Sequence, residues 1–313
     1  MVFFGTPAFA VPSLDALINS PHEVVAVVSQ PDRPKGRGQH LQPTPTKQLA
    51  ITHGIPVLQP AKIRDSAFWQ QIRDLHADLG IVVAFGRILP EELIAIPRLG
   101  MINVHASVLP RYRGAAPIQR AVINGDEETG VTIMRVEREL DAGPMFAVAT
   151  APISSDATSG EMAAILAPLG AQLLLDVVDD LAGGRAVETP QDHARATFAS
   201  KITKEEGAID WSLTARVIHN QVRGLQPWPL ASTRLHGARL VIRRTALAGA
   251  SPAPPDPAPA GTVVTGAGDK IIVACGEETF LEVLELQPEG KRTMTAREFL
   301  IGRGVTEGAR FTS

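Results

Sequence analysis

Residues 79–105, LGIVVAFGRILPEELIAIPRLGMINVH, contain the pattern that decides the fold. Two short apolar runs in this stretch, Leu79 to Ala84 and Met101 to His105, predict strands, because Val and Ile dominate them and turn residues bound each run. Both runs are nearly continuous in apolar character. This is typical of strands that are covered on both faces in a parallel sheet.

Similar runs and helical stretches alternate on either side of this segment. Further strands are predicted at Val2 to Phe4, Glu23 to Ser29 and Val131 to Val136. Helical spacing occurs at Pro12 to Asn19, Asp65 to Leu75 and Ala115 to Asn124. The alternation implies right-handed crossovers and an α/β fold with a doubly wound, mostly parallel sheet. Ligands of such sheets bind at the carboxyl ends of the strands.

The chain is long enough for two domains. It has 313 residues, of which 44% are hydrophobic and 20% charged, as in an ordinary globular protein. A long helix should begin at Thr158, because Thr158 to Glu161 has the spacing of a capping box, and Gly183-Gly184 should end it. Pro168 predicts a kink in this helix. We expect residues 1–183 to form the first domain and residues 184–200 a linker.

Residues 201–313 have a different pattern. Short strand-like runs without alternating helices predict a small antiparallel barrel, with strands at Arg239 to Arg243, Thr262 to Thr265, Ile271 to Ala274 and Leu281 to Leu286. Five prolines between Ala250 and Ala260 favour an extended surface loop. Trp211 and Trp228 are interpreted as core anchors of this domain rather than as base-stacking platforms.

Several classes of protein are disfavoured by composition. The single cysteine, Cys275, rules out an internal disulfide framework and a Cys-rich zinc ribbon, and it fits a reducing cytoplasm. The eight histidines show no metal-binding spacing, so we expect no metal. No apolar run approaches the 18 or so residues of a membrane span, and no leader-like segment opens the sequence.

Charge is unevenly distributed along the chain, whose formal net charge is −3. Residues 1–183 carry 14 Lys and Arg against 19 Asp and Glu, whereas residues 184–313 carry 16 against 14. Between Lys201 and Arg244, eight basic residues face three acidic ones. Such a local excess fits a polyanionic partner or a solvated charged face, and charge alone leaves both open.

Asn103 and His105 are the strongest candidates for chemistry. Side chains at i and i+2 share one face of a strand, so both should project together at its carboxyl end. An amide donor beside an imidazole can hold a developing oxyanion while a proton moves. A structural histidine beside a turn-forming Asn is the alternative. Asp141 follows the run Val131 to Val136, which would deliver it to the same edge, where it could orient the imidazole or be an ordinary turn residue.

Two predicted loops follow strands at the same edge. Gly5-Thr6-Pro7 follows the first strand, but neither GxGxxG nor GxxxxGK[ST] is present, which disfavours a dinucleotide or P-loop site. Gln30 to Gly38, QPDRPKGRG, follows the second strand and is basic. It could lay Arg33, Lys35 and Arg37 against a phosphate backbone, or it could be a plain solvated loop.

These segments together resemble the bacterial methionyl-tRNA formyltransferase family almost from end to end. The matching segments are Gly5-Thr6-Pro7, Gln30 to Gly38, Ile102 to Ser107, Leu109 to Gln119, Gly130 to Met134, Leu140 to Gly143, Lys204 to Trp211 and Pro227-Trp228-Pro229. The resemblance implies transfer of a formyl group from 10-formyltetrahydrofolate to the methionyl amino group of initiator tRNA. It also implies a Rossmann-like first domain, a C-terminal barrel similar to an OB-fold, and a cytoplasmic monomer without a membrane partner.

The resemblance assigns roles to individual residues. Asn103 and His105 would stabilise the tetrahedral oxyanion, and Asp141 would pair with His105. Folate would be lined by Phe85, Gly86, Ile88, Leu89, Val108, Leu109, Pro110 and Arg111. The tRNA would be contacted by Arg33, Lys35, Arg37, Lys201 and Lys204.

Four residues depart from the family pattern. Phe85 stands where Tyr is usual, Arg87 replaces an aliphatic residue, Tyr112 replaces Trp, and Glu139 stands where Gly is common. The alternative functions are a folate-dependent formyltransferase acting on an amino-sugar nucleotide, a nucleic-acid-binding module without catalysis, and a nicotinamide dehydrogenase. The basic loop argues against the amino-sugar enzyme, and the presence of Asn103, His105 and Asp141 argues against a module without catalysis. The missing glycine fingerprint argues against the dehydrogenase.

Overall fold

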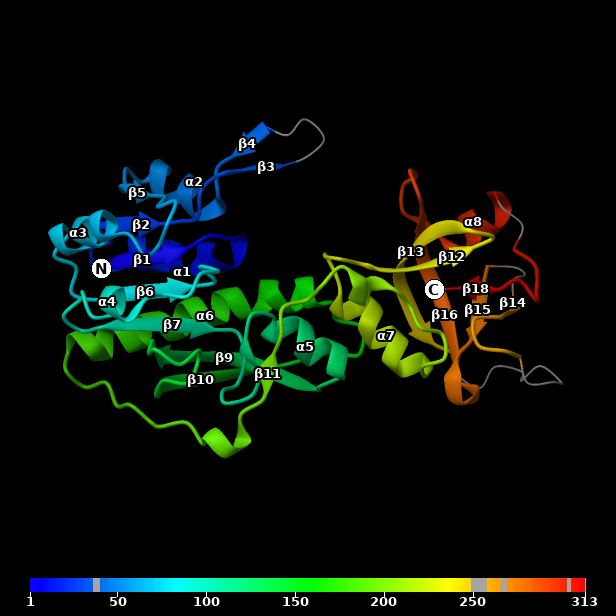
Figure 1. The fold of residues 1–313 in the computed structure, drawn as a ribbon. Coiled ribbons are helices and arrows are strands. Elements are labelled where there is room, and N and C mark those ends of the chain that lie inside the picture. The colour runs from blue at the N-terminus through cyan, green and yellow to red at the C-terminus, as the bar shows by residue number, and fades with distance from the viewer. Residues whose placement is uncertain (36–39, 249–257, 266–268, 303–304, 313) are drawn as a thin grey trace. The chain divides into compact units, whose positions relative to one another are not determined.

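Seven strands form one sheet in the order β10-β9-β7-β6-β1-β2-β5 (Figure 1). The computed structural model describes residues 1–35, 40–248, 258–265, 269–302 and 305–312. The parallel strands are β1 (Val2–Gly5), β2 (Ala26–Val28), β5 (Val57–Leu58), β6 (Gly80–Val83) and β7 (Met101–His105). β9 (Glu128–Arg135) and β10 (Met145–Pro152) add an antiparallel edge. The predicted doubly wound, mostly parallel sheet is confirmed.

Helices cross between the parallel strands. They are the 3-10 helix η1 (Ala8–Ala10) with α1 (Val11–Ile18), then α2 (Pro45–Thr52), α3 (Ser66–Asp74) and α4 (Glu91–Ile94). The Asp65 side chain caps α3 by accepting from the Ala67 N–H at 3.0 Å, and Thr44 caps α2 in the same way through Lys47. Apolar strand residues such as Val2, Phe4, Val28 and Met101 form one core cluster with the α3 residues Phe68 and Ile72.

Two short strand pairs complete this part of the chain. β3 (Arg33–Lys35) and β4 (His40–Gln42) form an antiparallel pair, so the basic segment that was expected to be a loop begins as a hairpin strand. β8 (Arg113–Gly114) pairs in parallel with β11 (Phe198–Ala199). The second pair connects the segment after β7 to the segment that was expected to be a linker.

The long helix α6 (Ser159–Ala182) begins at the predicted capping box. The Thr158 N–H donates to the Glu161 carboxylate at 2.8 Å, and the Glu161 N–H donates to the Thr158 hydroxyl at 3.2 Å. α6 is long and apolar enough to cross a membrane by length and composition, a test that core helices of globular proteins also pass. α6 packs on the first sheet, where Gly170 lies directly against Val104 of β7 and Val131 of β9.

Contacts divide the chain into two compact units. The first comprises Met1–Pro117, Glu128–Pro152 and Ala163–Ser200. The second comprises Ile118–Glu127, Ile153–Met162 and Lys201–Ser313. Helix α5 (Pro117–Asn124) therefore packs almost entirely within the second unit, where Gly224 approaches Ile123 so closely that a Cβ would lie 2.4 Å from its side chain.

The second unit is built on an antiparallel sheet that matches the predicted barrel-like domain. Its strand order is β14 (Val263–Thr265), β15 (Ile271–Ala274), β16 (Phe280–Pro288), β13 (Ala238–Leu247), β12 (Ala231–Leu235) and β18 (Phe311–Thr312), and β17 (Met294–Thr295) pairs with β16. Helices α7 (Ala215–Gly224) and α8 (Ala296–Gly302) accompany the strands, which the sequence pattern did not predict.

The core of the second unit corrects one expectation about its tryptophans. Trp211 is buried and stacks on Phe311 at 5.5 Å between ring centroids. Trp228, which was also expected in the core, is 55% exposed. It lies between two prolines in the segment that joins α7 to β12, and this segment leads its side chain to the surface. Cys275 is buried, and burial raises the pKa of its thiol to about 12, so the thiol stays protonated at neutral pH.

Substituting the two glycines of α6 should separate close packing from helix propensity. At Gly170 a Cβ would lie 2.8 Å from Val104, whereas at Gly160 the nearest atom would be 3.5 Å away. Both Gly→Ala changes replace a glycine of α6, and the gain in helix propensity is larger for the interior Gly170 than for Gly160 in the first turn. Only Gly170→Ala overpacks stiff β-branched neighbours, so it should be less stable than Gly160→Ala by about 1–3 kcal/mol in urea unfolding. Equal stability of the two variants would show that the contact is not tight.

Candidate active site

Asn103 and His105 lie at the carboxyl end of β7, between β6 and β9. Asn103 is opposite Val82 of the parallel strand β6 and Met134 of the antiparallel strand β9, and His105 is opposite Thr132. His105 is only 5% exposed, whereas Asn103 is partly exposed. Among the described residues, none makes a hydrogen bond with the Asn103 side chain. Its amide therefore stays available to a ligand at this edge of the sheet.

The His105 ring is held from two sides. Its Nε2 lies 2.9 Å from the carbonyl oxygen of Tyr112, and its Nδ1 lies 3.6 Å from Oδ2 of Asp141. Because a carbonyl oxygen only accepts, Nε2 carries a hydrogen in this arrangement. Nδ1 is then the nitrogen that faces the carboxylate. The structure thus brings His105 and Asp141 together, as the sequence predicted.

Asp141 is placed by a tightly packed turn. Its φ is +52°, in the left-handed region, and its Oδ2 accepts a hydrogen bond of 2.8 Å from the Gly114 N–H. Gly143 lies against the Arg135 carbonyl, where a Cβ would come within 2.2 Å, so no larger residue fits without a backbone shift. The Gln191 amide donates to the carbonyls of Asp141 and Gly143 at 2.9 and 2.8 Å. These contacts fix the carboxylate beside the imidazole.

Four residues that support the site were not identified from the sequence: Thr132, Arg113, Gln191 and Thr197. The buried Thr132 hydroxyl donates to the Ser107 carbonyl at 2.7 Å and accepts from the Leu109 N–H at 3.1 Å. Thr132 could have been noticed in the sequence, because it is a polar residue within the apolar run Val131 to Met134. Thr197 accepts from the Tyr112 N–H at 2.9 Å, but nothing in its sequence context indicates this contact.

Arg113 and Gln191 form the deepest polar contact near the site. Arg113 is 2% exposed and directs Nε and Nη2 at Oε1 of Gln191, at 3.1 and 2.8 Å. Its Nη2 also lies 3.1 Å from Nδ1 of His193, and its Nη1 lies 3.4 Å from the Glu139 carboxylate. Glu139, a departure from the family pattern, therefore pairs with this buried guanidinium.

The residues expected to line folate follow two adjacent strands. Phe85, Gly86, Ile88 and Leu89 follow β6, and Val108, Leu109, Pro110 and Arg111 follow β7, so both groups lie at the carboxyl edge. Within the first group the Phe85 ring is buried against Phe4, with centroids 5.5 Å apart, and Leu89 is also buried. Ile88 is 69% exposed, and Gly86 is exposed with a φ of +77°. Leu109 is buried, while Arg111 is exposed and lies over the Tyr112 ring at 5.2 Å.

The residues expected to contact tRNA lie in both units. Arg33 is exposed on β3, Lys35 ends that strand, and Arg37 lies outside the described residues. Asp32, directly before β3, accepts hydrogen bonds from Lys47 at 2.6 Å and from Gln59 at 2.7 Å. These bonds hold the pKa of Asp32 below its usual value. Lys201 and Lys204 are exposed in the second unit. The structure gives no grounds to join the two groups into one surface.

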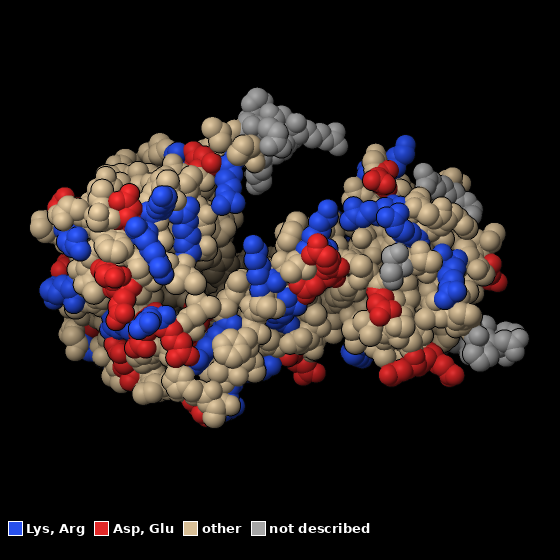
Figure 2. All heavy atoms as spheres, viewed as in Figure 1, with Lys and Arg blue, Asp and Glu red and all other residues tan. Residues whose placement is uncertain are grey.

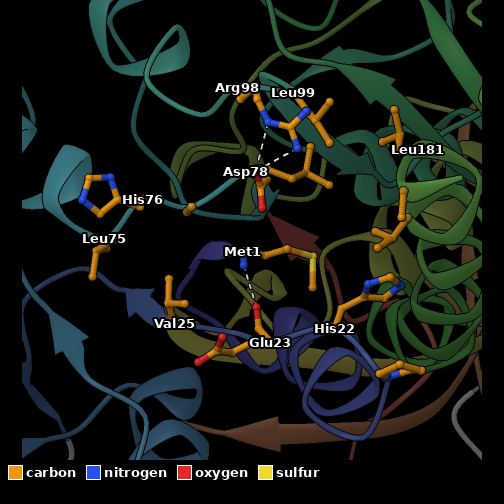
Figure 3. A pocket seen from close by; sticks show the side chains of 15 residues that line it. Met1, His22, Glu23, Val25, Leu75, His76, Asp78, Arg98, Leu99 and Leu181 are labelled. Atoms are coloured by element: carbon orange, nitrogen blue, oxygen red, sulfur yellow. Dashed lines mark hydrogen bonds and ion pairs between the residues drawn. The ribbon is translucent and has the colours of Figure 1, made fainter. Parts of the chain in front are cut away.

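A cavity of about 520 Å³ lies at the opposite edge of the first sheet (Figure 3). Met1, Val25, Leu79 and Leu99 line it, just before the amino ends of β1, β2, β6 and β7. Two of its charged lining residues pair with each other, since Arg98 bonds to Asp78 at 2.9 Å. The cavity is therefore separate from the Asn103 edge. In the described part of the chain no group of three or more His, Cys, Asp or Glu residues is placed to hold a metal ion.

Comparison with known families matches both parts of the chain. Residues 1–178 match the formyl transferase family, and residues 201–304 match the formyl transferase C-terminal domain. The chain belongs to the formyl transferase family. Members of known name include a methionyl-tRNA formyltransferase of Pelobacter propionicus, 48% identical over 98% of this chain and 94% of that protein. Another, of Moorella thermoacetica, is 46% identical over 98% of this chain and 97% of that protein.

Solved structures show the same fold at much lower identity. A sugar 3N-formyl transferase, WlaRD, aligns with a TM-score of 0.67 and 17% identity over 93% of this chain and 98% of that one. An N-formyltransferase of Helicobacter canadensis aligns with a TM-score of 0.67 and 16% identity over 92% and 98%. At these identities the likeness supports the formyl transferase fold and no particular acceptor.

Removing the Thr132 hydroxyl should loosen the segment after β7. Thr132→Val keeps the shape of the side chain but leaves the Leu109 N–H and the Ser107 carbonyl without this partner. An unsatisfied buried group costs about 1–3 kcal/mol, so the free energy of unfolding should fall by at least that amount in urea titration. Thr132→Ser keeps the hydroxyl and is the matched control. If Thr132→Val is as stable as Thr132→Ser, the hydroxyl is not needed there.

Proposed function

We propose that this chain transfers the formyl group of 10-formyltetrahydrofolate to the amino group of methionyl initiator tRNA. Full-length similarity supports the acceptor, because relatives named methionyl-tRNA formyltransferase are 44 to 48% identical to this chain. The observation that carries the chemistry is the placement of His105, 3.6 Å from Asp141, on the same strand end as the unengaged amide of Asn103.

The reaction needs charge stabilisation and one proton transfer. The amino nitrogen forms a bond to the formyl carbon, and the formyl oxygen becomes an oxyanion in the tetrahedral intermediate. The bond from that carbon to the donor nitrogen then breaks, and the proton lost by the amine ends on the donor nitrogen. We assign the oxyanion to the Asn103 amide as hydrogen-bond donor and to His105 through the positive charge of its imidazolium, since the Nε2–H of His105 already donates to the Tyr112 carbonyl. Preorganised groups at such a charge stabilise the transition state strongly.

Asp141 and His105 would handle the proton in this proposal. The carboxylate faces Nδ1 of the imidazole, so it can orient the ring and stabilise it when it is charged. The Gly114 N–H and the turn at Gly143 hold the carboxylate in place. A fixed carboxylate reorganises little during the reaction, which favours transfer.

The donor would lie along the edge formed by Gly86, Ile88 and residues 108–111. An exposed Ile88 supplies apolar surface for a ring system, and Gly86, which is exposed with a φ of +77°, makes the turn before it. These features fit a folate. Arg33, Lys35, Arg37, Lys201 and Lys204 would contact phosphates of the tRNA. We further propose that residues 1–183 carry the chemistry, that residues 201–313 add RNA contacts, and that the chain acts as a cytoplasmic monomer.

The proposed acceptor is tested by a parallel assay. Purified chain is mixed with 10-formyltetrahydrofolate and, separately, with methionyl initiator tRNA, methionyl elongator tRNA and an amino-sugar nucleotide. We expect formyl-methionine on the initiator tRNA and no modified sugar, because of the close similarity to the tRNA-dependent enzymes. A formylated sugar with unmodified tRNA would keep the catalytic residues and overturn the acceptor.

Truncating either residue assigned to the oxyanion should slow the chemical step. Loss of one oxyanion-stabilising group typically reduces kcat on the order of 10²-fold or more, so Asn103→Ala and His105→Ala should each fall that far while thermal unfolding stays near wild type. His53→Ala is a control, since His53 is exposed at the end of α2. Wild-type kcat in either test variant would remove that residue from the mechanism.

A further inference from the structure

Trp228 is a large aromatic side chain that the fold holds at the surface of the second unit. It is 55% exposed, whereas Trp211 in the same unit is buried. The short segment Pro227-Trp228-Pro229 joins α7 to β12. The exposure of one apolar residue is common in itself. The significance of Trp228 therefore depends on how it is held and on what surrounds it.

The segment is anchored before the tryptophan. The Ser159 hydroxyl lies within hydrogen-bond distance of the carbonyls of Gly224 and Gln226. The Gln226 side-chain amide donates to the Arg243 carbonyl at 2.7 Å. The residues directly before Trp228 are thus tied to the start of α6 and to β13.

The segment is anchored after the tryptophan as well. Gly207, at the end of the 3-10 helix η3 (Glu205–Gly207), lies against the Leu230 carbonyl, where a Cβ would come within 2.6 Å. The Leu230 N–H donates to the Leu225 carbonyl at 3.1 Å. An aromatic ring on a segment fixed at both ends loses little conformational entropy on binding, which is a property of binding anchors.

A bulge in β13 places an arginine next to this segment. Ile242 is opposite Leu286 and Arg244 is opposite Glu285, so Arg243 is an extra residue without a partner on β16. Bulges of this kind redirect side chains at functional sites. The carbonyl of this bulge residue, Arg243, is the one that accepts from Gln226. The bulge and the tryptophan segment therefore form one structural unit.

Basic residues lie on or directly beside two elements that contact the tryptophan segment, β13 and η3. Arg243 and the exposed Arg244 come from β13, and the exposed Lys204 precedes η3. Figure 2 shows Lys and Arg side chains gathered over β12 and β13. Four acidic residues are nearby: Glu206 is engaged by Arg120 at 2.5 Å, Glu161 is engaged by Thr158 at the start of α6, Glu205 follows Lys204 in η3, and Glu285 is opposite Arg244. Proteins bind unpaired nucleotides by combining a stacking aromatic ring with cations that contact the backbone.

We propose that Trp228 stacks on an unpaired base of the RNA substrate while Arg243 and Lys204 contact the adjacent phosphates. This inference rests on the proposed function for the identity of the RNA. It extends that function by naming an aromatic contact in the second unit, where sequence interpretation placed phosphate contacts alone.

Binding of initiator tRNA to the full chain tests the proposal. Trp228→Ala should raise Kd on the order of tenfold or more, the size of a lost base stack, and Trp228→Phe should restore most of the affinity. tRNA should quench the tryptophan fluorescence of the wild type, and Trp228→Phe should lose this quenching although it still binds. Arg243→Gln should lower the slope of log affinity against log salt by about one phosphate contact.

Two controls separate stacking from general effects. Ile301→Ala removes another exposed apolar side chain of the same unit and should bind tRNA like the wild type. Heparin, a polyanion without bases, should bind Trp228→Ala and the wild type equally. An unchanged Kd for tRNA in Trp228→Ala, or an equal loss toward heparin, would overturn the stacking contact. Failure of the wild type to formylate tRNA while tRNA still quenches its fluorescence would overturn only the proposed function.

Discussion

The segment that follows β7, residues 107–115, is largely buried yet forms almost no regular structure of its own. Its N–H and C=O groups therefore need partners from elsewhere, because an unpaired backbone group away from water is costly. The Thr132 hydroxyl donates to the Ser107 carbonyl and accepts from the Leu109 N–H. The Thr197 hydroxyl accepts from the Tyr112 N–H, and the Ala199 carbonyl accepts from the Ala115 N–H. The Asp141 carboxylate accepts from the Gly114 N–H. The contact that satisfies this last N–H also brings the carboxylate to His105, so backbone satisfaction and site geometry depend on one another.

The same constraint explains why three distant segments carry supporting residues. Thr132 comes from the antiparallel edge strand β9, Asp141 from the turn between β9 and β10, and Gln191 and Thr197 from the segment after α6. Each contributes hydrogen bonds rather than apolar area. Because the site is buried in this way, a lost partner affects the position of the segment as well as its stability.

Local patterns predicted the parts of this fold that local forces determine. The run 101–105 and the capping box at Thr158 carry their own signals, and the structure reproduces both. β10 was not predicted although its first five residues, Met145 to Ala149, are apolar; it is an edge strand, and most of its residues are exposed or half-buried. Long-range hydrogen bonds such as those of Gln191 leave no pattern in the sequence. A glutamine that bonds to a segment some 50 residues away along the chain cannot be distinguished in the sequence from any other polar residue. The burial of Trp228 was mispredicted for the same reason: hydrophobicity favours the core, but the anchoring of residues 226–230 keeps the side chain outside.

Net charge is a poor guide to the partner of this chain, because many of its cations are already paired. Arg113 is buried against Gln191, and Arg120 is engaged by Glu206, so neither is available to phosphates as an unpaired charge. The cations that we propose for phosphate contacts in the second unit are the exposed Lys201 and Lys204 and the half-buried Arg243. Phosphate contacts through such groups weaken steeply as salt rises, because binding releases counterions. A stacked ring contributes through surface burial and dispersion, which salt screens much less. An interface that combines the two would lose its phosphate contribution first as salt rises and keep the stacking contribution.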